Sequence, residues 1–435
     1  MGFYKLLFMS LTVLFGLLMS SVIFAEEYTI DSSEIDKKPY HLGGYAELRP
    51  LTFGLNKDSA LYKLKFYNQK KHDNIYEFNG ALQLEGSLEY GMARVYARTN
   101  TTYQKGYLGE TQATTLQEGY LSLKPAASLK IDAGKKTLNW GKGYAWNPVA
   151  FLDRPKDPDD PELSREGYYM LTADYVKSFQ GPLKTFSLTT VLYPEYEYIN
   201  STYATSSRMN FAGKAYFLLY DTDIDFILFT GGSKTTRYGF DFSRNITTNL
   251  EVHGEFAWID HFTRKFTDSS GNMLQTTYNA KSFLLGLRYL TEKEATYILE
   301  YYRNDTGFKT GEMKDYYAFI NRGYNSYLSS GSTMLLNKAA TLTTGSYGKP
   351  NPMRDYLYLR ASQKEPFDIL YFTPAITFIT NISDKSTSIS PELVYTGITN
   401  LELRLKAIFL AGGRNSDFGE KQNAYKVELR ARYYF

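Results

Sequence analysis

The sequence predicts an all-β fold, a transmembrane antiparallel up-and-down β-barrel of about 18 strands, with about 16 as the runner-up. Three observations predict it. Apolar and polar residues alternate along many segments, the N-terminus has the pattern of an export signal, and the chain ends on an alternating segment that closes with an aromatic residue. No later apolar run approaches the ~20 residues of a membrane-spanning helix. The best one, Tyr216 to Phe229, is interrupted by Asp221, Asp223 and Asp225.

Composition excludes several functional classes. The 435 residues carry 49 Lys+Arg against 46 Asp+Glu, a formal net charge of +3, so we predict no nucleic-acid partner. Because cysteine is absent, disulfides, thiolate metal sites, a cysteine nucleophile and covalent c-type haem are all excluded. Aromatic residues make up 16% of the chain, which is too many for a disordered protein.

The N-terminus predicts export. Residues 1–25 hold one charge, Lys5, then a long apolar stretch that ends at Ala25 before two glutamates. This pattern indicates a signal peptide cleaved after Ala25, and an uncleaved anchor helix is the alternative. Residues 26–40 are then a short periplasmic N-terminal segment, and residues 41–435 form the barrel.

The alternation is clearest from Tyr76 to Tyr90, where Leu82 and Leu84 alternate with Gln83 and Glu85. Such a strand is longer than the five or six residues usual in soluble sheets. It fits a tilted membrane strand, with the apolar face toward lipid and the polar face toward a wet lumen.

The C-terminal segment has the same alternation. Val427, Leu429, Tyr433 and Phe435 share one face, and charged residues share the other. It resembles the terminal strand of Gram-negative outer-membrane barrels, in which a final Phe serves the insertion machinery. The resemblance implies an assembly signal at Tyr433 and Phe435, location in the outer membrane, and two partners, the outer-membrane lipid and the barrel-assembly machinery. An edge strand of a soluble sandwich is the alternative, and it would be prone to aggregation.

Long connections alternate with short turns, which places both termini at one end of the barrel. The long connections are expected near residues 105–114, 139–166, 194–206, 262–276, 304–353 and 413–422. Seventeen strands are expected near residues 75–89, 92–104, 115–124, 128–138, 167–178, 183–193, 207–220, 224–232, 235–243, 249–261, 277–291, 295–303, 354–363, 367–379, 386–396, 400–412 and 423–435. One more strand comes from residues 42–67, where Leu42–Arg49 and Leu61–Tyr67 compete.

The connection 139–166 is the most distinctive. Its Trp140-Gly141-x-Gly143 followed by Asn147-Pro148 is similar to a motif that recurs among outer-membrane barrels, many of them uncharacterised. Three further prolines stiffen it, so it either folds into the lumen as a constriction or remains a surface loop. The candidate constriction residues are Trp140, Asp153, Arg154, Asp157, Asp159 and Asp160. The Gly-, Ser- and Thr-rich connection 304–353 is the second candidate plug and is expected to be mobile.

The polar parity of the strands supplies candidates for the pore wall. They are Glu77, Glu85, Glu89, Arg94, Arg98, Lys130, Asp132, Arg288, Arg360, Arg404, Lys406, Arg430 and Arg432. These charges either keep the pore hydrated and orient the solutes in it, or they hold the wall together as ion pairs. The loop acids do not follow the spacing of a calcium-binding loop, so neither a metal nor another cofactor is predicted.

The pattern as a whole predicts a porin-like outer-membrane channel for passive diffusion of small hydrophilic solutes. The alternative is a structural barrel that sheathes a partner such as a periplasmic multihaem cytochrome. A hydrolase is less favoured, because only four histidines and no G-x-S-x-G segment are present, so we predict no catalytic residues. The sequence indicates no oligomeric state.

Overall fold

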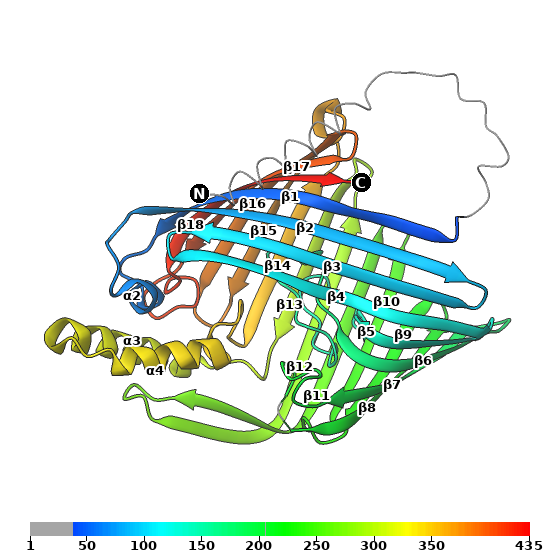
Figure 1. Ribbon diagram of the computed structural model, residues 1–435, viewed down its shortest axis with the longest axis horizontal. Coiled ribbons are helices and arrows are strands. Elements are labelled where there is room, and N and C mark those ends of the chain that lie inside the picture. The colour runs from blue at the N-terminus through cyan, green and yellow to red at the C-terminus, as the bar shows by residue number, and fades with distance from the viewer. Residues whose placement is uncertain (1–37, 205) are drawn as a thin grey trace, which may run out of the picture. The chain divides into compact units, whose positions relative to one another are not determined.

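The computed structural model describes residues 38–204 and 206–435. Eighteen antiparallel strands form one sheet in which each strand pairs with its neighbours in the chain (Figure 1). β1 (Tyr40–Leu55) pairs with both β2 and β18, which closes the ring. The predicted up-and-down barrel and its strand number are therefore confirmed. The predicted signal peptide and nearly all of the segment 26–40 lie outside the described residues.

The other strands mostly follow the predicted alternation of short and long connections. The strands are β2 (Asn74–Tyr90), β3 (Ala93–Gly106), β4 (Gly109–Ala126), β5 (Leu129–Lys136), β6 (Tyr168–Ser178), β7 (Leu183–Glu195), β8 (Arg208–Leu219), β9 (Thr222–Thr230), β10 (Arg237–Thr247), β11 (Leu250–Thr267), β12 (Met273–Leu290), β13 (Ala295–Arg303), β14 (Asp355–Gln363), β15 (Phe372–Asn381), β16 (Ser386–Ile398), β17 (Leu401–Ala411) and β18 (Asn423–Tyr434). The long connections lie at one end of the ring, which is called the loop end below, and Tyr40 and Phe435 lie at the other.

The two faces of the strands differ as the alternation requires. On β2, Leu82 and Leu84 are 40% and 47% exposed, whereas Gln83 between them is only 7% exposed. On β18, Leu429 is exposed while Glu428 and Arg430 are buried. The outer face is therefore apolar and the inner face polar, the reverse of a soluble protein.

Two predicted loops are largely strand. β3 and β4 continue to a tight turn at Tyr107 and Leu108, so the expected connection 105–114 is wrong. The prediction failed because these extensions are polar on both faces, and an apolar–polar alternation cannot reveal them. β11 and β12 likewise extend into residues 262–276, and β15 begins later than expected, at Phe372.

The choice within residues 42–67 is also settled. β1 covers Leu42–Arg49, whereas Leu61–Tyr67 is almost entirely helix α2 (Ala60–Phe66). Ser59 begins this helix by accepting a hydrogen bond from the backbone N–H of Tyr62 at 3.2 Å, as N-cap residues do.

The connection 304–353 is largely helical rather than an irregular loop. It holds α3 (Thr310–Ser330), α4 (Met334–Leu342) and the π-helical turn η2 (Thr343–Tyr347). Gly331 ends α3 with φ 71° and donates its N–H to the Tyr327 carbonyl at 2.9 Å. Among the described residues, no helix is long and apolar enough to cross a membrane.

The helices α2, α3 and α4 pack together at the loop end (Figure 1). Their apolar core includes Phe308, Tyr316 and Tyr347, whose rings stack at centroid distances of 4.1 and 3.9 Å. Trp146 of the connection between β5 and β6 joins the same core. The connection that the sequence singled out therefore contributes to the same apolar core as the helices.

Candidate functional site: a loop tethered across the barrel interior

The connection from residue 137 to residue 167, called the inserted loop below, is bound first to β11. The Glu255 carboxylate accepts hydrogen bonds from the backbone N–H groups of Lys142, Gly143 and Val149 at 2.7, 2.6 and 3.3 Å. It also accepts one from the Asn147 side chain at 3.1 Å. Glu255 is only 3% exposed, and these donors offset part of the cost of burying its charge.

Neighbouring strands extend this attachment. Glu300 on β13, which is fully buried, accepts hydrogen bonds from the backbone N–H groups of Tyr144 and Ala145. Lys142 places its Nζ 3.0 Å from a carboxylate oxygen of Asp225 on β9. The segment 142–149 is thus held by β9, β11 and β13.

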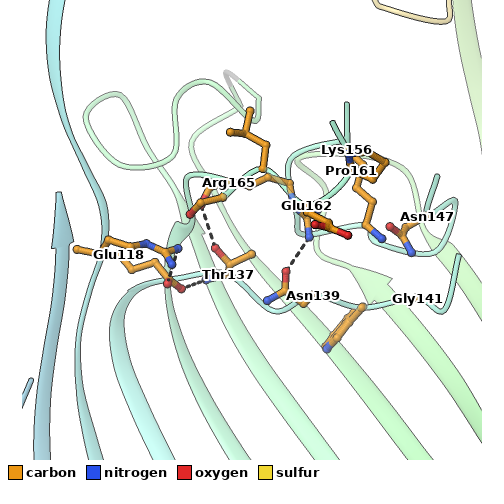
Figure 2. Close-up of a pocket in the computed structure, with 13 residues that line it drawn as sticks. Glu118, Thr137, Asn139, Gly141, Asn147, Lys156, Pro161, Glu162 and Arg165 are labelled. Carbon is orange, nitrogen blue, oxygen red and sulfur yellow. Dashed lines mark hydrogen bonds and ion pairs between the residues drawn. The ribbon is translucent and has the colours of Figure 1, made fainter. Parts of the chain in front are cut away.

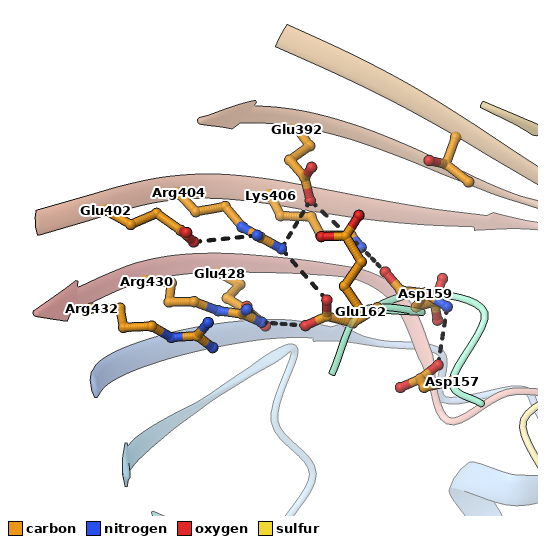
Figure 3. Close-up of polar contacts among 12 residues, drawn as sticks. Asp157, Asp159, Glu162, Glu392, Glu402, Arg404, Lys406, Glu428, Arg430 and Arg432 are labelled. Atoms are coloured by element: carbon orange, nitrogen blue, oxygen red, sulfur yellow. Dashed lines mark hydrogen bonds and ion pairs between the residues drawn. The ribbon is translucent and has the colours of Figure 1, made fainter. Parts of the chain in front are cut away.

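A second attachment lies on the closing strands of the ring. Asp160 contacts Arg430 of β18 at 2.8 Å and Arg404 of β17 at 3.6 Å. Lys406 of β17 donates to the Asp159 carbonyl (Figure 3). Burial alone would raise the pKa of Asp160, but these three cations outweigh burial and hold the pKa below its ordinary value. We call this cluster the β17–β18 attachment.

These contacts place the loop inside the barrel. It leaves the wall between β5 and β6, and it is held by strands around β11 and by strands around β17. In the ring order, β5, β11 and β17 are six strands apart, about a third of the circumference each. A loop on the outer surface cannot contact wall segments so far apart, so the inserted loop crosses the interior.

The glycines of the Trp-Gly-x-Gly segment permit this close approach. A Cβ on Gly141, which has φ 95°, would lie 2.7 Å from the Glu255 carboxylate. A Cβ on Gly143 would lie 2.1 Å from the Trp146 carbonyl oxygen. The motif thus allows successive backbone N–H groups to converge on one carboxylate of the wall.

The acids at the root of the inserted loop serve its own fold. Asp153 accepts hydrogen bonds from the backbone N–H groups of Leu138 and Trp140 at 2.8 and 3.1 Å, and burial raises its pKa. Arg154 pairs with Glu166 at 2.8 Å. In residues 38–204 and 206–435, no group of three or more His, Asp or Glu side chains is arranged to hold a metal ion.

A polar cavity of about 360 Å³ lies beside the inserted loop (Figure 2). The strand wall contributes Arg98 of β3 and Glu118 of β4, which pair at 2.8 Å. The loop contributes Asn139, Lys156 and Arg165 among others. The cavity therefore lies between the loop and the β3–β4 wall, a sector that neither attachment covers.

The strand charges singled out in the sequence mostly pair along the wall rather than across it. Arg98 and Arg432 each lie within 3.0 Å of a carboxylate on a neighbouring strand, and Arg360 of β14 lies 3.0 Å from Glu392 of β16, two strands along the ring. Other contacts along the wall are Arg94 with Glu89, Lys130 with Asp132, Arg404 with Glu402, Lys406 with Glu392, Arg430 with Glu428, Glu85 with the Tyr96 hydroxyl, and Glu77 with Asn79. Arg288 lies on β12 opposite Glu251 of β11.

Sequence reasoning missed several acids that complete this network. Glu47 on β1 pairs with Arg432 at 2.6 Å, and Glu392 on β16 pairs with Arg360 at 3.0 Å. Asp225 is one of the residues that interrupt the apolar run from Tyr216 to Phe229. Asp225 lies between apolar residues that face outward on β9, and this alternation was a signal that its side chain faces the interior.

Solved structures share the fold at low sequence identity. OccK11 (OpdR) from Pseudomonas aeruginosa aligns with a TM-score of 0.51 and 11% identity, covering 91% of this chain and 96% of that chain. OccD3 (OpdP) from the same organism aligns with a TM-score of 0.46 and 8% sequence identity, covering 91% of each chain. A triple mutant of the Rhodopseudomonas blastica porin aligns with a TM-score of 0.43 and 10% sequence identity, covering 91% of this chain and 100% of that chain. The likeness to OccK11 is one of fold.

No protein-family model and no curated protein matches the sequence.

Proposed function

We propose that the protein is an outer-membrane, porin-like channel through which small hydrophilic solutes diffuse passively, and that the inserted loop is its constriction. One observation carries the proposal. The loop is fixed at two wall regions and leaves a polar cavity beside β3 and β4. Solutes that cross the barrel would pass on this side, along the Arg98–Glu118 pair.

Membrane location follows from the outer face. The exposed positions of β2, β17 and β18 carry Leu82, Leu405 and Leu429, which are 40–51% exposed. In water such a surface would drive aggregation, whereas lipid accommodates it. Ring closure by β1 and β18 satisfies the strand edges, as the hydrocarbon region requires. The predicted export signal and the terminal Phe435 agree with this location.

The inserted loop argues against the sheath alternative. A barrel that surrounds a partner polypeptide needs an open lumen, but here the chain's own loop crosses the interior and packs Trp146 into the helical core. His253, one of the four histidines that a hydrolase could use, is buried beside Glu300 at 2.9 Å. A channel with a narrowed interior is consistent with both the loop that crosses the barrel and the buried position of His253.

Planar-bilayer conductance of the purified protein tests the function, and its lack of cysteine allows the path to be mapped. Glu162 lines the cavity, and Leu82 lies on the outer face. We expect a charged, water-soluble thiol reagent to reduce the conductance of Glu162→Cys and to leave that of the matched control Leu82→Cys unchanged. A folded protein without conductance would contradict the channel, and equal effects on both variants would contradict the path.

A deletion tests the constriction itself. Removing Asp153–Glu162 removes the β17–β18 attachment together with the loop tip, so single-channel conductance should rise clearly. An unchanged conductance in a folded deletion variant would show that another segment sets the narrowest section. The helical connection between β13 and β14 would then be the next segment to shorten.

A further inference from the structure

Three cations gather at the loop end, away from the β17–β18 attachment. Lys234 lies in the connection between β9 and β10, Arg237 begins β10, and Lys349 lies in the connection between β13 and β14. Burial, and then the positive charges of Arg237 and Lys349, lower the pKa of Lys234 to about 7. Burial and Arg237 also lower the pKa of Lys349. The three positive charges therefore share one region and repel one another.

An aromatic floor supports two of them. The Lys234 Nζ lies 3.3 Å from the centroid of the Tyr203 ring. The Arg237 guanidinium lies 5.8 and 5.9 Å from the rings of Phe151 and Phe229. The Tyr203 hydroxyl donates to the Phe151 carbonyl at 3.1 Å, which fixes this floor to the inserted loop. Ring faces attract cations but do not supply the acceptors of a carboxylate.

The position of Arg237 directs it inward. Gly239, two residues further along β10, packs so closely that a Cβ would lie 3.2 Å from Val149 and 3.3 Å from Phe151 of the inserted loop. Residues two apart on a strand share a face, so Arg237 faces the interior as well. Tyr238 between them is 50% exposed on the outer face.

The cluster lacks a compensating acid. Among residues 38–204 and 206–435, no carboxylate forms an ion pair with Lys234, Arg237 or Lys349, and the Nε of Arg237 is buried without a hydrogen-bond partner. The acid that acts on Lys234 is Glu195. Its carboxylate already accepts hydrogen bonds from the Ser206 backbone and hydroxyl at 2.9 and 2.6 Å, and one from Ser233 at 3.2 Å.

The other charged residues of the inner wall are arranged differently. Arg430 and Arg432 each contact a carboxylate within 3.0 Å. Positive charges without such partners, partly buried and provided with an unused donor, are suited to an acceptor that comes from solution.

We propose that Lys234, Arg237 and Lys349 form a binding site for small multivalent oxyanions, such as phosphates or polycarboxylates, at the loop end of the barrel. Several acceptor oxygens on one ligand would satisfy three separated cations at once, which a single chloride cannot do. That this site recruits solutes for a channel rests on the function proposed above. That it binds such anions does not.

Calorimetric titration of the folded, detergent-solubilised protein tests the site without requiring conductance. Inorganic phosphate and citrate are titrated separately, so that phosphate chemistry is distinguished from polycarboxylate chemistry. The double variant Lys234→Gln/Lys349→Gln should bind the preferred anion at least about tenfold more weakly. Lys71→Gln is the matched control, because Lys71 is an exposed lysine in the β1–β2 connection at the same end.

The outcomes separate the two proposals. Binding that is lost in the double variant and kept in the control supports the site, whether or not current flows. Wild-type protein that binds neither anion, or a double variant that binds as tightly as wild type, overturns the site even if the protein conducts. Binding by a folded protein that does not conduct supports the site and contradicts the channel.

Discussion

Gly143 donates its backbone N–H to the Glu255 carboxylate at 2.6 Å, although 112 residues separate the two in the chain. The hydrogen bond joins the inserted loop to the inner face of β11. It requires a residue without a side chain, because a Cβ at position 143 would meet the Trp146 carbonyl. A feature of the sequence motif is therefore explained by a contact with a distant strand.

Substitution of this glycine should loosen the loop. We expect Gly143→Ala to displace the backbone from Glu255 and to lower the free energy of unfolding by ~2 kcal/mol, since hydrogen bonds to a charged group contribute ~1.5–3 kcal/mol each. Single-channel recordings should show larger fluctuations. Gly413→Ala is the control, because its added Cβ would meet nothing within 4 Å. Equal stability and equal current noise in the two variants would contradict the role of Gly143.

The β17–β18 attachment should weaken in acid. Because Arg430, Arg404 and Lys406 hold the pKa of Asp160 below its ordinary value, the attachment is fully stabilising above pH ~4 and is lost as the pH falls through the lowered pKa. The conductance of the wild-type protein should therefore increase on acidification within that range. Asp157, Glu392 and Glu428 are further carboxylates near the same cations.

A substitution distinguishes Asp160 from these neighbours. Asp160→Asn removes the titrating charge but keeps a side chain of the same shape, so its conductance at pH 7 should match that of the wild-type protein in acid. Bilayer recordings across the pH range measure both. A variant that still shows the full acid-induced increase would assign the effect to another group.

The two faces of the barrel wall should differ in their tolerance of charge. Leu82→Arg places a charge on the apolar outer face and should destabilise the folded protein in liposomes by ~2–4 kcal/mol. Thr102→Arg should cost much less, because Thr102 pairs with Ala81 on the inner parity and is exposed there. Denaturant titration of both variants measures the difference. Equal costs would contradict the assignment of the faces.

Phe435 should matter for assembly. Its backbone exchanges two hydrogen bonds with Gly44, at 3.0 and 3.1 Å, next to the seam of β1 and β18. Deletion of Phe435 should lower the amount of heat-modifiable barrel in the outer membrane. Phe435→Ala retains these backbone bonds, so a low yield in this variant would identify the aromatic ring as the signal. If both variants assemble at the wild-type level, Phe435 is not required.

Much of the wall could be predicted from the sequence. Successive side chains of a strand point to opposite faces, and the environments of the two faces, apolar outside and polar inside, differ sharply. Leu82, Gln83 and Leu84 show this in three consecutive residues. The apolar–polar alternation disappears where both faces of a strand contact water, and for this reason the ends of β3 and β4 were not predicted. The helix α3 was also missed, although Met313, Tyr316, Tyr317 and Ile320 have helical spacing and are buried.

The attachments of the inserted loop could not be predicted in the same way. Asp160 was singled out as a candidate constriction residue, but the sequence alone did not connect it with Arg430, 270 residues away. Such a pair depends on the curvature and closure of the whole sheet. Local patterns identify which residues are polar and inward, and only the closed ring determines which of them meet.

The seam between β1 and β18 also sets an order on folding. Glu47 and Arg432 are 385 residues apart and meet where the ring closes, so this contact carries a large loop-closure entropy cost unless the intervening strands have already paired. Arg430, which holds Asp160, lies on the same closing strand. The β17–β18 attachment of the inserted loop therefore depends on ring closure, and a partly built wall, whose strand edges are still free, lacks it.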